Sequence, residues 1–395
     1  MTQSSRPSPR VALVTNVLAH YRVPCFRRLG EALPTGLDLF LLTESMAHRH
    51  YVMAQGDGEA SAASQLGPAV RTEVLPGRSW RRPPFDDVHW NQTAPVHRGR
   101  YDVLILGGWA EPTFLELWLR HWPRRTRVFF WVESTLRDSR RVGWKEWPKR
   151  LLLAGAAGCL VPGRRSAAYC AALGMPRERI HTAPNATDGA WFRRQAEALA
   201  PQRSALRGEF GLDGPTALFV GRLVETFKGI EGLLRAVALV PGLRLLMAGE
   251  GPDRGAYEAL ATQLELGDRA RFLGNLDHER LCRAYAAVDM LVLPSRSETW
   301  GFVLNEGMEF GLPLVVSDAV GAVDDLVVEG DNGFIVPSGD VRALGDALGR
   351  LARDEALRLR LGEASRRRIE AFSPDAWARG VLAAVEGAAV EGAGR

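Results

Sequence analysis

The sequence predicts an α/β protein made of two Rossmann-like, doubly wound domains, and three observations support this fold class. The chain has 395 residues, which is long for one hydrophobic core and ordinary for two. Short apolar runs recur along it with helical patterns between them, and such continuous runs are typical of parallel strands covered on both faces. The runs also fall into two groups, with a polar stretch that lacks any strand pattern between them.

Taken in chain order, the strand-like runs define the two domains. The first group is VALVTN, LDLFLLT, YDVLILGG, RVFFWVE and GCLVPG. The second group is TALFVGR, LRLLMAGEG, RFLG, DMLVLPS, PLVVSD and GFIVP. The polar connector DGAWFRRQAEALAPQRSALRGEFGLDGP lies between them and places the boundary near residues 193–210. We therefore predict a first domain over residues 1–195 and a second over residues 205–372.

The last part of the chain, residues 373–395, has an amphipathic helical pattern and lies beyond the last strand of the second domain. Our interpretation is that this helix packs back on the first domain. Two doubly wound sheets are expected to face each other across a cleft, because open α/β sheets bind ligands at the carboxyl ends of their strands. We therefore expect the functional residues in loops that leave the strands.

Composition limits the kind of protein. Hydrophobic residues make up 46% and charged residues 24%, a profile typical of a soluble globular chain. The polar start MTQSSRPSPR and the short run after it do not fit a signal peptide, and no apolar run reaches the length of a membrane span, so we expect a cytoplasmic protein. The net charge of +4 is spread along the chain and does not indicate nucleic acid, although it leaves phosphate-bearing ligands or an anionic membrane surface open.

The four cysteines do not indicate a metal site. Cys25, Cys159, Cys170 and Cys282 are scattered, form no CxxC pair and have no histidine pair at ligand spacing. This pattern argues against zinc and fits a reducing compartment. We interpret them as ordinary core or surface thiols.

Two cations follow the first strand of the second domain. In FVGRLVETFKG, Arg222 stands at the carboxyl end of the predicted strand and Lys228 follows six residues later, ahead of a helical pattern. Both are expected at the mouth of the cleft, where they can bind phosphate. Alone, each also fits an ordinary solvated loop residue.

Two glutamates flank a Trp-Gly break in SETWGFVLNEGMEFGLPLVVSD. With a helix starting near Gly301, Glu306 lies roughly 7 to 8 Å along the axis from Glu298, which precedes the helix. A helix N-terminus favours anions, and two carboxylates at this separation suit a long ligand with hydroxyls at both ends and phosphate between, such as a nucleotide sugar. The alternative is that Glu306 is an exposed helix residue and Glu298 a loop carboxylate.

Five blocks in this order carry a family resemblance: FVGRL to FKG, the GEGP loop, RFLGNL, ETWGFVLNE and NGFIVP. Over roughly residues 215–345 the chain resembles the donor domain of family 4 glycosyltransferases, which have the GT-B fold. The spacing of the two glutamates alone is a weak signal, whereas the ordered set is specific. One departure follows Asp318, where the family often has Gly-Gly and a Glu but this chain has GAVDD, so the role of Asp325 stays open.

The resemblance implies a role for each site residue. It implies that Glu298 contacts the donor sugar, that Glu306 holds the ribose hydroxyls, and that Arg222 and Lys228 bind the diphosphate as it leaves. Further donor-binding positions implied by the matched blocks are Gly221, Gly249, Gly251, Gly301, Phe302, Arg271, Phe272 and Leu273, with the last three lying against the base largely through their backbone.

The resemblance also implies the chemistry. The expected enzyme is a retaining hexosyl or N-acetylhexosaminyl transferase that uses a nucleotide diphosphate sugar, most commonly with UDP, as co-substrate. No cofactor or metal is expected, because fixed cations and a helix terminus meet the leaving-group charge and the chain lacks an Asp-x-Asp motif. The family has no generally agreed protein nucleophile, so we expect front-face substitution.

The first domain carries fainter signals for the acceptor. His20, in HYRVP after the first strand, is a candidate catalytic residue that guides an acceptor or a phosphate, or an incidental loop histidine. Glu133, after RVFFWV, occupies a position where several relatives have a histidine, and either a structural cap or an acceptor base fits it. Eight of the eleven tryptophans precede residue 150, and two or three of them suit an acceptor wall.

The segment VGWKEWPKRLLL raises the question of a membrane surface. Trp144, Trp147 and Leu151 are spaced as on one helix face, with Lys145, Lys149 and Arg150 beside them, which is typical of a helix on an anionic surface. Pro148 and the small net charge argue against it, and the same pattern suits a buried helix. We expect either weak, salt-sensitive contact or a water-soluble acceptor, so lipid-linked glycans, glycans and small hydroxylated metabolites all stay open.

Two other readings compete. A GT-B phosphorylase or a nucleotide-sugar epimerase shares the fold, but the first needs a cofactor lysine in a longer chain and the second lacks this block order. A non-catalytic protein that only binds a nucleotide sugar, or that partners another transferase, is the second alternative.

Overall fold

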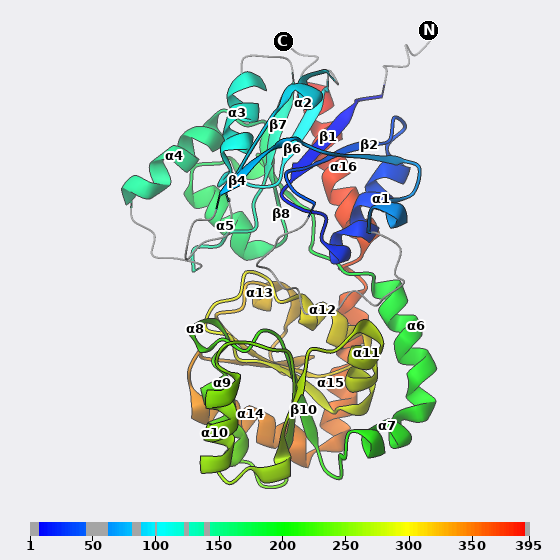
Figure 1. The fold of residues 1–395 in the computed structure, drawn as a ribbon, viewed down its shortest axis with the longest axis vertical. Coiled ribbons are helices and arrows are strands. Elements are labelled where there is room, and N and C mark those ends of the chain that lie inside the picture. Colours follow the sequence, from blue (N-terminus) through cyan, green and yellow to red (C-terminus); the bar gives the residue numbers. More distant parts are fainter. Residues whose placement is uncertain are drawn as a thin grey trace. The chain divides into compact units, whose positions relative to one another are not determined.

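The computed structural model describes residues 8–44, 62–80, 88–98, 101–121, 126–137 and 143–391. These residues form two compact units. Unit 1 holds the chain up to Thr187 together with the segment that starts at Ser373, and unit 2 runs from Asp188 to Phe372 (Figure 1).

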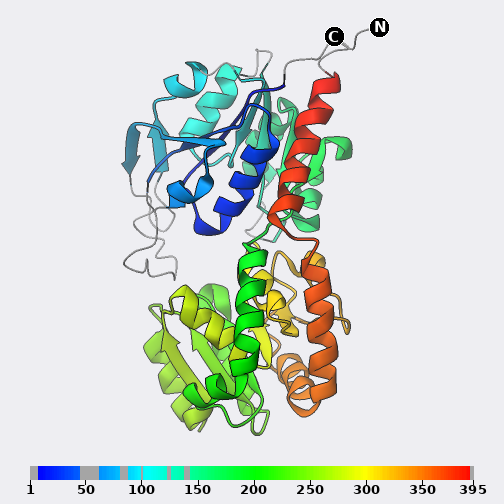
Figure 2. The ribbon, with the colours of Figure 1, turned by 90° about the vertical axis from the view of Figure 1, so that its right-hand side faces the viewer.

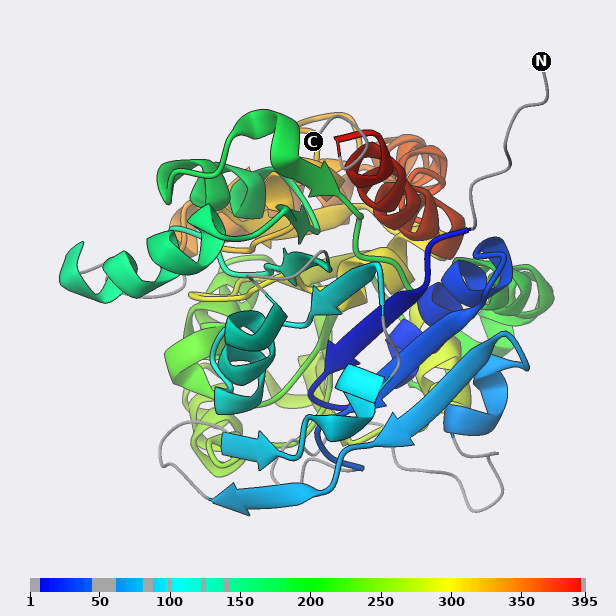
Figure 3. The same cartoon turned by 90° about the horizontal axis from the view of Figure 1, so that it is seen from above.

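Unit 1 is built on a seven-stranded parallel sheet with the strand order β3-β2-β1-β6-β7-β8-β9. Figure 3 shows β1, β2 and β3 side by side in shades of blue. The strands are β1 Val11–Thr15, β2 Leu37–Leu41, β3 Val70–Val74, β6 Val103–Leu106, β7 Arg127–Trp131, β8 Gly158–Val161 and β9 Ile180–Thr182. A separate antiparallel ribbon consists of β4 Gly77–Trp80 and β5 Val88–Asn91. The helices are α1 Val23–Ala32, α2 Ala94–Arg98, α3 Pro112–His121, α4 Gly143–Ala154, α5 Arg164–Ala172 and α16 Pro374–Glu391.

Helix α16 closes one face of the unit 1 sheet beside α1, as Figure 2 shows in red and blue. Trp377 is fully buried there, with its ring centroid 5.7 Å from that of Phe26 and 5.4 Å from that of Trp131. Gly380 lets the helix approach the sheet, because a Cβ at this position would lie 2.1 Å from the carbonyl oxygen of Thr182. The last helix is therefore part of the core of unit 1.

Unit 2 is built on a six-stranded parallel sheet with the strand order β12-β11-β10-β13-β14-β15. The strands are β10 Thr216–Val220, β11 Arg244–Ala248, β12 Ala270–Gly274, β13 Met290–Leu293, β14 Leu314–Ser317 and β15 Gly333–Val336. The helices are α6 Gly189–Leu199, α7 Arg203–Glu209, α8 Glu225–Lys228, α9 Ile230–Ala238, α10 Arg254–Gln263, α11 His278–Ala287, α12 Phe302–Glu309, α13 Val323–Leu326, α14 Val341–Arg353 and α15 Glu355–Ile369.

The strand order of each sheet reverses direction once. In unit 2 the chain passes from β10 outward to β12 and then returns to place β13 on the other side of β10. In unit 1 the same reversal lies between β1 and β6. Ligands of doubly wound sheets bind at such switch points, so the loops after these strands are the places to look for a site.

Every strand run predicted from the sequence is a strand in the structure, and the prediction of a doubly wound α/β fold is confirmed. Four strands were not predicted: β3, β4, β5 and β9. The expected connector is helical in the structure. It belongs to unit 2 from Asp188 onward, because α6 packs on α11 and α12 and Arg193 of α6 pairs with the buried Glu309.

Candidate functional site

The two predicted cations lie on one loop at the switch point of unit 2. The chain leaves β10 through Gly221 and Arg222, and the short helix α8 then ends at Lys228. The Lys228 ammonium group donates a hydrogen bond to the Glu298 carboxylate, and their side chains are 18% and 21% exposed. Arg222 is exposed. The structure therefore brings the predicted phosphate ligand Lys228 together with the predicted sugar ligand Glu298.

The α8 loop is fixed to the loop that carries Glu298. The backbone amides of Arg296 and Ser297 both donate to the carbonyl oxygen of Phe227, at 2.7 and 3.1 Å. The Glu225 carboxylate accepts a hydrogen bond from the Arg296 guanidinium at 2.8 Å. These contacts fix the loop after β10 against the loop after β13. They therefore determine the position of the Lys228–Glu298 pair.

The Trp-Gly break is a tight turn at the start of α12. Gly301 caps the helix with φ 96°, in a region that favours glycine, and a Cβ there would lie 2.9 Å from the Leu293 side chain. The buried Trp300 indole donates to the side-chain oxygen of Asn305 at 2.9 Å. Glu298 is held through its backbone, because its carbonyl oxygen accepts from Gly321 at 2.7 Å. Phe302 is the first residue of the helix.

Glu306 is buried on α12, with 6% of the residue exposed. The Tyr285 hydroxyl of α11 donates to its carboxyl group at 2.8 Å, and burial raises the pKa of Glu306 to about 7 although this hydrogen bond opposes the shift. The alternative of an exposed helix residue is therefore wrong. A buried carboxyl with one remaining oxygen is suited to bind hydroxyl groups.

The predicted glycines have a packing reason that the sequence does not reveal. A Cβ on Gly249 would lie 2.0 Å from the carbonyl oxygen of Gly221, and a Cβ on Gly251 would lie 2.2 Å from that of Leu223. The Gly249 amide also donates to the carbonyl oxygen of Gly274 at 2.8 Å. These residues bring the ends of β10, β11 and β12 into direct backbone contact.

The β12 positions point in different directions. The Arg271 guanidinium donates to the carbonyl oxygen of Phe210 at 2.5 Å, which ties β12 to the end of α7. Phe272 and Leu273 are partly buried against the hydrophobic core of unit 2. The Arg271 side chain thus makes a contact within unit 2, and the role of this segment toward a donor stays a prediction.

In unit 1, the sequence identified Glu133 but missed its partner. The side chain of Arg22 is only 7% exposed, and its guanidinium pairs with the Glu133 carboxylate, which is 38% exposed. Arg22 also donates to the side-chain oxygen of Asn185 at 2.7 Å and lies 4.3 Å over the Trp131 ring. The pentapeptide HYRVP contains Arg22, yet nothing in the sequence marks Asn185. His20 begins the 3-10 turn two residues before Arg22 and is partly exposed.

The described tryptophans that precede residue 150 fall into two groups. Trp118 and Trp131 are buried and Trp109 is partly buried, so these rings belong to the core. The exposed ones are Trp80, Trp90, Trp144 and Trp147. Trp122 lies outside the described residues.

Metal-ligating residues are not gathered in the part of the chain that the structure describes. All four cysteines are buried free thiols, and no group of three or more His, Cys, Asp or Glu residues could hold a metal ion. Among the described helices, none combines the length and the apolar character needed to cross a membrane.

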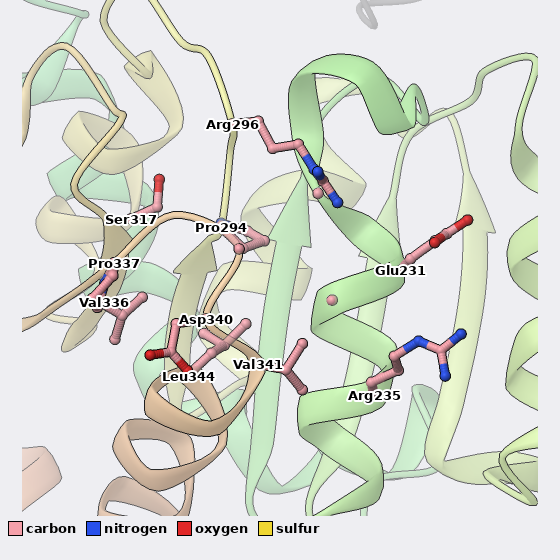
Figure 4. A pocket seen from close by; sticks show the side chains of 13 residues that line it. Glu231, Arg235, Pro294, Arg296, Ser317, Val336, Pro337, Asp340, Val341 and Leu344 are labelled. Carbon is pink, nitrogen blue, oxygen red and sulfur yellow. The ribbon is translucent and has the colours of Figure 1, made fainter.

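A cavity of about 120 Å³ lies beside the predicted donor site, at the start of α9 and α14 (Figure 4). Gly229, Pro294 and Val341 are among its lining residues. Its wall contains none of Arg222, Lys228, Glu298 and Glu306. These four residues, called the charged cluster from here on, thus lie outside the wall of this cavity.

The two parallel-sheet α/β units have the architecture of GT-B proteins, and comparison with known proteins gives the family. Residues 203–368 match the family described as Glycosyl transferases group 1. The lipopolysaccharide core biosynthesis glycosyltransferase LpsE of Rhizobium meliloti (strain 1021) is 30% identical over 316 residues, which are 77% of this chain and 86% of LpsE. The chain belongs to this family, the family 4 type of glycosyltransferase, as the resemblance predicts.

Other comparisons agree. The D-inositol 3-phosphate glycosyltransferase of Xylanimonas cellulosilytica is 34% identical over 216 residues, which are 53% of this chain and 51% of that protein, so this match spans about half of the relative. The solved structure of HepE from Anabaena has a TM-score of 0.72 at 16% identity and covers 96% of this chain and 100% of its own. The last comparison concerns the fold alone.

Proposed function

We propose that this glycosyltransferase moves a hexosyl or N-acetylhexosaminyl group from a nucleoside diphosphate sugar to a hydroxyl group of its acceptor, with retention of configuration. The observation that carries the proposal is the cluster at the switch point of unit 2, where Lys228 and Glu298 meet beside Arg222 and Glu306 is buried on the adjoining helix. UDP is the proposed carrier, because HepE, which shares the fold, has been solved in complex with UDP.

In the proposed complex, cationic side chains bind the diphosphate of the donor and carboxylates bind its hydroxyl groups. Arg222 and Lys228 take the diphosphate, because guanidinium and ammonium groups form charge-assisted hydrogen bonds with phosphate oxygens. Glu306 accepts hydrogen bonds from the ribose hydroxyls and Glu298 from the sugar, since neither carboxylate can face the phosphates. The backbone of Arg271, Phe272 and Leu273 lies against the base, and the backbone of Gly301 and Phe302 orients the sugar.

In the reaction, the bond between the anomeric carbon and the phosphate oxygen breaks and a bond from the acceptor oxygen to the same face of that carbon forms. The acceptor proton passes to the departing phosphate oxygen. Arg222 and Lys228 stabilise the negative charge that grows on the diphosphate, so the protein contributes mainly preorganised electrostatics and positioning. No metal ion is part of the proposal.

The acceptor is proposed to bind at unit 1. Glu133, held by Arg22, presents a fixed carboxylate to an acceptor hydroxyl, and His20 stands on the same loop as Arg22. The names of relatives include a lipopolysaccharide core enzyme and D-inositol 3-phosphate transferases, so glycans, lipid-linked glycans and small hydroxylated metabolites are all proposed acceptor classes.

Weak contact with an anionic membrane surface is part of the proposal. Helix α4 continues through Pro148 and exposes Trp144 by 74%, Trp147 by 62% and Leu151 by 48%. Exposed aromatic and aliphatic side chains on one short helix suit the interface of a bilayer. The contact is expected to be weak, because Lys149 on this helix is engaged by Glu146 and Tyr169. It is expected to be salt-sensitive, because it depends on attraction between basic side chains and anionic lipid. The proposed location is the cytoplasm, with peripheral contact at the inner face of the membrane.

The donor proposal is tested by measuring thermal shifts with a panel of nucleoside diphosphates, followed by mass spectrometry of products from a panel of donor sugars. UDP should stabilise the protein most, and one UDP-hexose should be hydrolysed or transferred. Stabilisation by none of the nucleotides would reject the donor site.

The membrane proposal is tested by co-sedimentation with vesicles that contain anionic lipid, at low salt and at 0.3 M salt. Binding at low salt alone is expected, and Trp144→Ala with Trp147→Ala should abolish it. No binding at either salt would remove the membrane contact from the proposal.

A further inference from the structure

The ribbon of β4 and β5 has two chemically different faces. Arg78 pairs with Trp90 and Trp80 pairs with Val88 in the antiparallel register, so these four side chains share one face. Trp80 is 46% and Trp90 58% exposed on this face. On the other face, the flanking His89 and Asn91 are each only 4% exposed.

The inner face fastens the ribbon to the sheet of unit 1. The side-chain amide of Asn91 donates to the carbonyl oxygens of Leu42 and Leu75, at 2.9 and 2.7 Å. Leu42 and Leu75 directly follow β2 and β3. The ribbon is therefore attached at the carboxyl ends of these strands, the edge at which doubly wound sheets bind ligands.

A buried carboxylate adds a second attachment at the same edge. Glu111 accepts a hydrogen bond from the His89 amide at 2.7 Å and one from the Asn16 side chain at 3.2 Å. Asn16 follows β1 directly. The Thr113 hydroxyl accepts from the Asn91 amide at 2.9 Å, which fixes the ribbon to α3. The two exposed indoles thus stand on a ribbon that is attached to the residues directly after β1, β2 and β3.

Polar groups border the exposed indoles. The Trp90 indole donates to Glu116 at 3.4 Å, and the same carboxylate accepts from the Thr93 hydroxyl at 2.7 Å and pairs with Arg120 at 3.0 Å. Arg78 is exposed on the indole face itself. Flat aromatic faces bordered by carboxylate and guanidinium groups match a sugar ring, which offers an apolar C–H face and a rim of hydroxyls.

We propose that Trp80 and Trp90 form a carbohydrate platform that binds a sugar residue of the acceptor glycan, away from the hydroxyl that receives the transferred group. This deepens the proposed function, on which it rests for the acceptor class. The platform has charged side chains next to its indoles, whereas the exposed tryptophans of α4 lie in a row with a leucine. It assigns the enzyme to glycan acceptors, with the platform and Glu133 as separate contacts for different parts of the acceptor.

The test is binding of the intact protein to a printed array of oligosaccharides of glucose, galactose, mannose and N-acetylglucosamine. The variant Trp80→Ala with Trp90→Ala should bind the recognised glycan at least about tenfold more weakly, because stacking on both rings is lost. The variant Trp80→Phe with Trp90→Phe should retain most of the binding, since a ring remains at both positions. The matched control Leu239→Ala with Leu359→Ala, which removes two exposed apolar side chains of unit 2, should bind as the wild type does.

Three results would overturn the platform. The first is that the wild type binds no glycan on the array, and the second is that the Trp80→Ala, Trp90→Ala variant binds glycans as well as the wild type does. The third is that this variant loses binding to vesicles but keeps its binding to glycans. The thermal midpoint of each variant should stay near that of the wild type, because both indoles are largely exposed. Donor hydrolysis without acceptor is measured in parallel and should survive the double substitution. Its absence from the wild type would count against the proposed donor chemistry, whereas the array result concerns the platform alone.

Discussion

The ammonium group of Lys228 and the carboxylate of Glu298 form an ion pair that joins the loop after β10 to the loop after β13. In the proposed complex, Lys228 binds the diphosphate of the donor and Glu298 binds its sugar. Each charge therefore holds its partner in place while it also competes with the ligand for that partner.

Glu298→Gln should separate nucleotide binding from turnover. The neutral amide no longer competes for Lys228, so UDP should bind as tightly as to the wild type or more tightly. Turnover should fall because the sugar loses its charged hydrogen-bond partner. Calorimetric titration with UDP and initial rates with the UDP-sugar measure the two effects. Weakened UDP binding together with normal turnover would contradict the assigned roles.

Arg222→Met and Lys228→Met should each lower kcat by about 10² to 10³, because both cations stabilise charge that develops as the diphosphate leaves. Arg235→Met, an exposed arginine on α9 outside the charged cluster, is the matched control and should leave kcat unchanged. Rates are compared with and without EDTA. Loss of activity in EDTA that Mg²⁺ restores would reject the metal-free scheme.

Glu306→Gln should change how stability depends on pH. Burial raises the pKa of Glu306 to about 7 from its ordinary value of 4.5, so between these pH values the folded protein holds a proton that the unfolded chain has released. This contribution is fully present below pH 4.5 and is lost as pH rises through 7. Above pH 8 the variant should therefore be more stable than the wild type by about 3 kcal/mol.

Urea unfolding of the wild type and the Glu306→Gln variant from pH 5 to pH 8.5, followed by a signal from unit 2, measures the difference. The gap should widen from pH 5 to about pH 7 and then level off, because above the folded pKa both states have lost the proton, whereas glutamine keeps an acceptor for the Tyr285 hydroxyl without carrying a charge. A gap that is the same at all pH values would show that Glu306 does not titrate in this range.

Glu306→Ala should weaken binding of free UDP by roughly 1.5 to 3 kcal/mol for each charge-assisted hydrogen bond to ribose that is lost. Wild-type affinity should rise as pH increases through 7, because the ionised carboxylate is the better acceptor. The control is Glu309→Ala on the same helix, whose carboxylate is bound by Arg193 and is outside the proposed set. Unchanged UDP affinity in Glu306→Ala would disprove the ribose assignment.

Arg22→Gln should reduce activity by about tenfold or more, and it should do so through Glu133. In the Glu133→Gln background the same change should have little further effect, because the partner that Arg22 positions is already gone. Arg22→Lys, which retains the charge, should recover part of the activity. Donor hydrolysis and transfer are measured separately for each variant. Losses that simply add would show that Arg22 is only a structural residue.

The sequence was sufficient for the strands that are buried on both faces, because their apolar runs are continuous. It was insufficient for β3, whose segment VRTEV buries only Val70 and exposes the other four residues. It was also insufficient for the ribbon of β4 and β5, where each strand has four residues and only alternate positions of β5 are buried. Short strands at the margin of a fold lack the pattern on which the prediction depends.

The site was predictable where its residues lie close together in the chain. Glu298, Gly301 and Glu306 belong to one segment, and a helix start explains their spacing. The partners Tyr285 of Glu306 and Arg22 of Glu133 were not predictable, because these pairs are 21 and 111 residues apart and the contacts depend on how the helices and strands pack. The burial of Glu306 likewise depends on residues outside α12, among them Tyr285 of α11, and the sequence of α12 alone does not show it.

Helix α16 has a consequence for the order in which the chain can fold during synthesis. Unit 2 is continuous from Asp188 to Phe372, so all of its residues have been synthesised before α16 exists. Unit 1 lacks Trp377, and with it the ring that packs on Phe26 and Trp131, until residues 374–391 have been synthesised. Synthesis of unit 1 therefore begins before that of unit 2 but is completed after it. During synthesis, the face of the unit 1 sheet beside α1 stays uncovered while unit 2 is already able to fold.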